Sequence, residues 1–127
     1  MRAFTKVNLA PSSPYLSVLR NKIRYGSEPD NPSLITLWLI QENEFISTDI
    51  SLEENWQRHE SQFRLLLETV VDELVPSHWR CLCLDYIYKP LSSLQRLSTT
   101  DSTSKKFHSL MHELSQSSQY VSASLSA

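Results

Sequence analysis

The fold is decided by residues 51–75, which have the sequence SLEENWQRHESQFRLLLETVVDELV. Ser51 and Glu54 match a capping box, in which the serine hydroxyl and the glutamate carboxylate each bind the other residue's backbone amide. Apolar side chains then recur at steps of about three and four, as on one face of an amphipathic helix. This stripe consists of Leu52, Trp56, His59, Phe63, Leu66, Leu67, Val70 and Leu74. We expect one uninterrupted helix about 35 Å long as the central element of the fold.

A second helix is expected before this segment, over residues 14–25. Ser13 followed by Pro14 is typical of a helix start, because serine can cap free amides and proline suits the first helical position. Gly26 is placed to end the helix in the left-handed conformation. The apolar positions between these two signals are Tyr15, Leu16, Leu19 and Ile23.

The segment between these two helices allows two interpretations, because residues 34–40 are apolar almost without interruption. Such a run can form a buried helix or a buried strand. Asn31 and Pro32 repeat the helix-start signal, which favours a helix over residues 32–43. The alternative is a β-hairpin over residues 34–50.

Two further helices are expected after the long one. The spacing of apolar residues favours a helix over a strand at residues 79–88, and Pro90 should kink or break that helix. The last helix should start near Ser102 or Ser104. The apolar residues of the two helices are Trp79, Leu82, Cys83, Tyr86 and Ile87 in the first, and Phe107, Leu110, Met111 and Leu114 in the second.

These patterns predict an all-α bundle of four to five helices around one long central helix. Residues 1–13 are expected to form a flexible N-terminal arm, residues 14–114 a single helical domain, and residues 115–127 a disordered serine-rich tail. The alternative fold is α+β, with a hairpin at 34–50 and a strand at 79–88 packed against the long helix.

The composition excludes several classes of function. The only glycine among the 127 residues is Gly26, whereas phosphate-binding loops, dinucleotide-binding turns and the hydrolase nucleophile elbow each need two or more. The formal charge of −2 provides no broad attraction to nucleic acids or membrane surfaces. No stretch approaches the roughly 20 apolar residues that span a bilayer, and no secretory signal is visible. We therefore expect no membrane association and a cytoplasmic, intracellular location.

Metal binding and catalysis are not expected. Cys81, Cys83, His108 and His112 are of the types that bind zinc, but Cys-x-Cys is shorter than the usual ligand spacing and places the two thiols on different sides of a helix. No serine or cysteine stands with a base in a recognisable catalytic motif. We expect no metal, no cofactor and no enzymatic activity.

The favoured function is non-catalytic protein–protein interaction, as an adaptor, chaperone or regulatory subunit. A helix at 34–40 would be apolar on nearly every side, and such a helix must lie centrally in the fold or be covered by another protein or a second copy of the chain. Aromatic side chains on the next element can extend this surface. The predicted partner-binding residues are Leu34, Leu37, Trp38, Ile40, Tyr86, Tyr88 and Lys89.

The alternative function is transcriptional regulation by a helix-turn-helix over residues 47–64. Its recognition helix would begin near Asn55 and present Gln57, Arg58, Ser61 and Arg64 to DNA. DNA binding is not favoured, because Glu53, Glu54 and Glu60 would lie near the phosphates.

Overall fold

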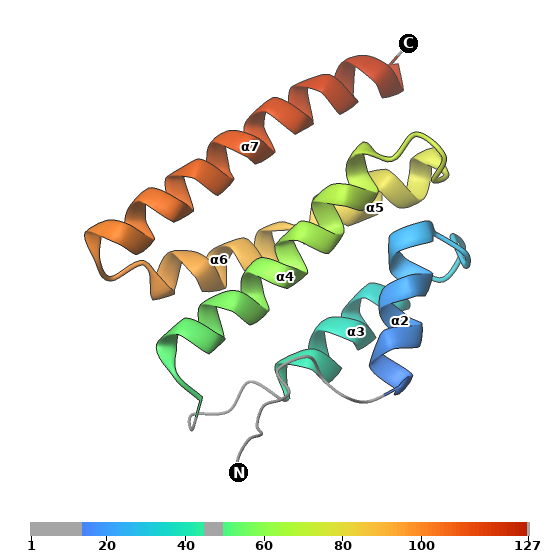
Figure 1. Cartoon of the computed structure of the whole chain (residues 1–127). Helices are drawn as coiled ribbons and strands as arrows, with labels where there is room; N and C mark the ends of the chain where they lie inside the picture. Colours follow the sequence, from blue (N-terminus) through green and yellow to red (C-terminus); the bar gives the residue numbers. More distant parts are fainter. Residues whose placement is uncertain (1–13, 45–49, 127) are drawn as a thin grey trace.

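Helices form the whole regular secondary structure of residues 14–44 and 50–126, the part of the chain that the computed structural model describes (Figure 1). They are α2 (Pro14–Tyr25), α3 (Ser33–Asn43), α4 (Leu52–Val71), α5 (Ser77–Tyr86), α6 (Tyr88–Leu97) and α7 (Asp101–Ser126). The prediction of an all-α bundle is confirmed. The alternative hairpin at 34–50 and strand at 79–88 are wrong, because α3 covers residues 34–43, and α5 and α6 cover residues 79–88 except Ile87. The predicted arm over residues 1–13 and part of that hairpin, residues 45–49, lie outside the described residues.

The central helix is α4, as predicted. It contacts α2, α5, α6 and α7, and Figure 1 shows it between the α2–α3 pair and α7. The predicted capping box is present: the Glu54 amide donates to Ser51 Oγ over 3.1 Å, and the Ser51 amide donates to Glu54 Oε1 over 3.4 Å. The buried residues of α4 are Trp56, His59, Gln62, Phe63, Leu65, Leu66, Leu67, Thr69 and Val70.

Both ends of the predicted α4 stripe are wrong. Leu52, the first residue of α4, is 53% exposed. Leu74 is 95% exposed, because the helix ends at Val71 and Leu74 lies in the turn that follows. Asp72 fixes this turn: its Oδ1 accepts a 3.0 Å hydrogen bond from the Leu74 amide, and its Oδ2 accepts one of 2.8 Å from Arg24 of α2.

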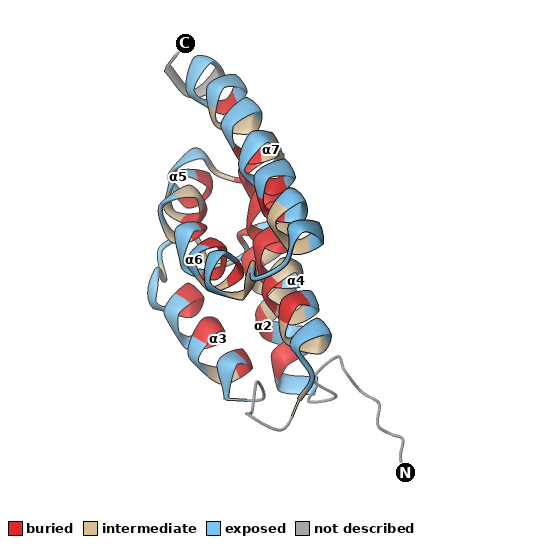
Figure 2. Ribbon diagram, turned by 90° about the vertical axis from the view of Figure 1, so that its left-hand side faces the viewer, coloured by how far each residue is buried: buried red, intermediate tan, exposed pale blue. Residues whose placement is uncertain are grey.

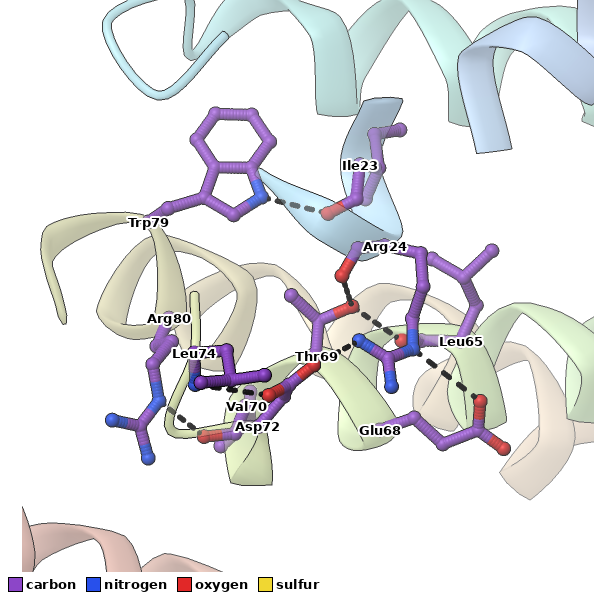
Figure 3. Close-up of polar contacts among 10 residues, drawn as sticks. All are labelled: Ile23, Arg24, Leu65, Glu68, Thr69, Val70, Asp72, Leu74, Trp79 and Arg80. Carbon is purple, nitrogen blue, oxygen red and sulfur yellow. Dashed lines mark hydrogen bonds and ion pairs between the residues drawn. The ribbon is translucent and has the colours of Figure 1, made fainter. Parts of the chain in front are cut away.

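Side chains of other elements bind carbonyl groups near the C-terminal ends of α2 and α4 (Figure 3). The last carbonyls of a helix lack partners within that helix. The indole Nε1 of Trp79 donates to the Ile23 carbonyl over 2.8 Å, and Arg80 Nε donates to the Val70 carbonyl over 2.9 Å. These contacts attach α5 to both α2 and α4.

The core contains all three tryptophans of the sequence. Trp38 of α3 and Trp79 of α5 are fully buried, and Trp56 of α4 is 4% exposed. Trp56 Nε1 donates to Glu60 over 3.2 Å. Three of the six described helices therefore place an indole ring inside the bundle.

The predicted break at Pro90 is present between α5 and α6. Proline has no amide proton, so no i→i−4 bond to the Tyr86 carbonyl can form. Accordingly α5 ends at Tyr86, Ile87 follows, and Pro90 lies in the first turn of α6, where its missing donor is tolerated.

The described part of the predicted disordered tail is helical instead. Helix α7 runs past residue 114 to Ser126. Val121, seven residues after Leu114, extends the apolar stripe and is 1% exposed. The Tyr120 hydroxyl donates to Glu73 Oε2 over 2.7 Å. These two side chains attach the C-terminal part of α7 to the bundle, although its serine-rich composition had indicated no packing partner.

Gly26 provides the first test of the fold. Its φ of +59° is left-handed, and an added Cβ would lie 2.9 Å from Val75 Cγ1 and 3.0 Å from Trp79 Cδ1. We expect Gly26→Ala to lower the free energy of unfolding by about 1–2 kcal/mol or more, from backbone strain and crowding together. Urea denaturation measures the change, with exposed Ser27→Ala as the control. A Gly26→Ala variant as stable as the wild type would contradict this account.

Candidate functional site

The α3 residues predicted to bind a partner divide between the core and the surface. Leu34 and Trp38 are buried, at 6% and 0% exposure, so the structure places these two predicted residues in the core of the bundle. Leu37 and Ile40 are exposed, at 37% and 54%. One face of α3 packs on the bundle, and the exposed face carries Leu37 and Ile40 together with polar side chains.

The other predicted residues belong to α5 and α6, which lie on the same side of the bundle as α3 in Figure 2. Thr36 Oγ1 of α3 donates to the Tyr86 hydroxyl over 3.4 Å, which brings α3 and the end of α5 into contact. Lys89 Nζ lies 6.0 Å from the centre of the Tyr86 ring, and Tyr88 is 56% exposed.

A pocket of about 510 Å³ lies between α3 and α6, with α4 and α5 contributing to its walls. We call it the α3–α6 groove. It contains two of the predicted residues, Tyr88 and Lys89. Its lining consists of Leu39, Asn43, Gln62, Asp85, Tyr88, Lys89, Pro90, Ser92 and Ser93.

Gln62 connects the groove to a buried polar network. It is 1% exposed, and its Nε2 donates to Asn43 Oδ1 over 3.0 Å and to Glu42 Oε1 over 3.2 Å. The Glu42 carboxylate is buried and forms an ion pair with Arg20 of α2, whose Nη2 lies 2.9 Å from Oε1. His59 Nδ1 lies 3.3 Å from Gln62 Oε1. A buried carboxylate needs such partners, because removing it from water is costly. The network therefore holds α2, α3 and α4 in fixed relative positions beside the groove.

Sequence reasoning missed Asn43, Gln62, Asp85, Ser92 and Ser93 as lining residues. One signal was available for Gln62: it lies three residues after His59, so the two side chains share one side of a helix. The others are polar residues whose approach to one another depends on the angle between α3 and α6, which sequence spacing does not contain.

The residues predicted to contact DNA do not form a helix-turn-helix in the described part of the chain. Helix α4 continues from Leu52 to Val71 with no turn near Asn55. Gln57 and Ser61 are exposed and Arg58 is half-buried. Arg64 forms ion pairs with Glu113 of α7 and Glu60 of α4, so its charge is already paired.

The cysteines and histidines considered as metal ligands do not converge. In residues 14–44 and 50–126, no group of three or more His, Cys, Asp or Glu side chains is arranged to hold a metal ion. Cys83 is buried on α5 and Cys81 is exposed. His108 and His112 are exposed on α7. Burial raises the pKa of the Cys83 thiol to about 12, so this thiol is protonated at neutral pH.

We expect the two thiols to differ in reactivity, because the thiolate is the reactive form. Iodoacetamide should add one label to the native chain, at Cys81, and two labels in denaturant. Intact-mass measurement with peptide mapping gives the sites. Cys81→Ser should accept no label in the native state; rapid native labelling of Cys83 would show that α5 is packed differently.

The buried His59 predicts a pH-dependent stability. Burial of the ring lowers the pKa of His59, and the positive charge of Arg96 on α6 lowers it further. The hydrogen bond to Gln62 and the negative charge of Glu42 raise this pKa, but the net shift is downward. The unfolded state, with a histidine pKa near about 6.5, then binds the proton more readily. Stability is therefore present above about pH 6.5 and is lost as the pH falls through that value.

Urea midpoints at about pH 7 and about pH 5 test this sign. We expect the wild type to lose more stability on acidification than His59→Gln, whereas the exposed-site control His108→Gln should follow the wild type. Equal losses in the wild type and His59→Gln would contradict the assignment to His59.

Comparison with known proteins gives no family or structural relative for the chain. No helix within the described residues has both the length and the apolar character to cross a bilayer. No protein-family model matches the chain, and no curated protein or solved structure matches it significantly.

Proposed function

We propose that this chain is a non-catalytic protein-interaction module, acting as an adaptor, chaperone or regulatory subunit. Its binding surface consists of the exposed side of α3, represented by Leu37 and Ile40, together with Tyr86, Tyr88 and Lys89 beside the α3–α6 groove. The observation that carries this proposal is that α3, whose buried face packs on the bundle, also exposes the large apolar side chains of Leu37 and Ile40.

The chemistry of the surface supports this proposal. Ile40 and Tyr88 are each more than half exposed. An apolar face that another molecule covers gains the free energy of removing that surface from water. Tyrosine is a frequent anchor of protein interfaces, because it combines apolar area with a hydroxyl group.

The fold also supports a binding surface that is rigid. The ion pair and hydrogen bonds that join Arg20, Glu42 and Gln62 fix α3 on α2 and α4. A surface held in place before binding loses less conformational entropy when the partner arrives. The contacts of the buried face of α3 thus fix the position of its exposed face, to which we assign binding.

Ile40→Glu tests the proposal. A carboxylate at the centre of an apolar interface should weaken partner binding at least about tenfold, the effect of removing a strong anchor. Because Ile40 is 54% exposed, the circular dichroism spectrum and thermal stability should change little. The control is Met111→Glu on α7, a substitution at another exposed apolar side chain, 44% exposed.

The measurement is affinity purification of the full tagged chain from cells of its natural host, with quantitative mass spectrometry, beside light scattering of the purified chain. We expect a protein, or a second copy of the chain, to be lost with Ile40→Glu and retained with Met111→Glu. A monomer that recovers the same proteins with and without Ile40→Glu would overturn the proposal.

A further inference from the structure

We propose that the α3–α6 groove binds a segment of a partner protein that carries an apolar side chain between one acidic and one basic residue. This inference rests on the proposed function and specifies the chemistry of the partner. It is carried by the lining of the groove and by two charged side chains that have no ion-pair partner in the described part of the chain.

The lining suits a polypeptide segment, because it combines polar with apolar side chains. Six of the nine lining residues are polar or charged, and the other three are Leu39, Pro90 and Tyr88. A peptide supplies both a side chain for the small apolar part and backbone donors and acceptors for the rest.

Two lining residues of opposite charge, Asp85 and Lys89, give the groove one acidic and one basic position. Asp85 and Lys89 lie four residues apart, on either side of the helix break at Ile87, and both line the groove. Neither forms an ion pair with another residue of segments 14–44 and 50–126. An occupant with an acidic group near Lys89 and a basic group near Asp85 complements both. A nucleic acid or an anionic membrane complements only Lys89 and is repelled by Asp85.

The hydrogen-bonding side chains of the groove differ in whether they already have partners. Gln62 Nε2 already donates to Glu42 and Asn43, and Ser93 Oγ accepts from Arg96 and donates to the Lys89 carbonyl. The side chains of Tyr88 and Ser92, one helical turn apart on α6, line the groove and are available to an occupant. Together with Lys89, these side chains of α6 provide the specific contacts, and Gln62 is a lining residue whose position the buried network fixes.

A peptide-display experiment on the full chain tests this inference. A random peptide library is the probe, and enriched sequences are synthesised and titrated by fluorescence anisotropy. We expect enriched peptides to carry an apolar residue between an acid and a base. Lys89→Glu and Asp85→Lys should each weaken binding about fivefold, the upper range for an exposed ion pair.

The matched variant is the double exchange D85K/K89E, which keeps the net charge and reverses the polarity of the groove. It should bind the charge-reversed peptide in preference to the original, whereas Lys105→Glu on α7 should bind as the wild type does. Circular dichroism confirms that each variant is folded. Binding by D85K/K89E with unchanged preference, or the absence of any enriched peptide, would overturn the inference.

The outcome for Ile40→Glu separates this inference from the proposed function. In one outcome, Ile40→Glu abolishes peptide binding and the charge variants leave it unchanged. That outcome overturns the role of Asp85 and Lys89 but supports the binding surface on α3. Peptide binding that none of these substitutions alters overturns both proposals.

Discussion

The structure depends on the burial of α4 on more than one side. Gln62 and Thr69 face α3 and α2, whereas Arg64 reaches α7 and the Val70 carbonyl binds Arg80 of α5. A helix of 20 residues with so much buried surface is stable only when other helices surround it. The remaining helices take their positions from this requirement, and the α3–α6 groove lies where two of the covering helices approach each other.

The candidate site combines a buried carboxylate and exposed apolar side chains on one helix. The carboxylate of Glu42 is buried, and it is tolerated because Arg20 and Gln62 bind it from two other helices. The apolar side chains of Leu37 and Ile40 are exposed on the helix that this carboxylate anchors. The polar network therefore keeps an apolar surface rigid and open to solvent, a condition that favours binding by a preformed site.

The sequence predicted what local chemistry determines. Ser51 and Glu54 marked the start of α4, Gly26 the end of α2, and Pro90 the break between α5 and α6, because each acts on the backbone of its own segment. Tertiary contacts decided the rest. Leu74 is exposed because Asp72 turns the chain, and α7 extends past residue 114 because Val121 and Tyr120 contact the bundle. The division of α3 between buried Trp38 and exposed Ile40 depends on which face meets α2, and a continuous apolar run cannot specify that.

The distribution of the three buried indoles gives the protein an intrinsic optical reporter. Trp38, Trp56 and Trp79 lie in three separate helices, and their emission should be blue-shifted in the folded chain and move to longer wavelength when these helices separate. Helix α7 contains no tryptophan. The same holds for α2 and α6. Unfolding of one of these three helices would therefore change the circular dichroism signal more than the fluorescence, and a circular dichroism transition that precedes the fluorescence transition would show that a helix without tryptophan unfolds first.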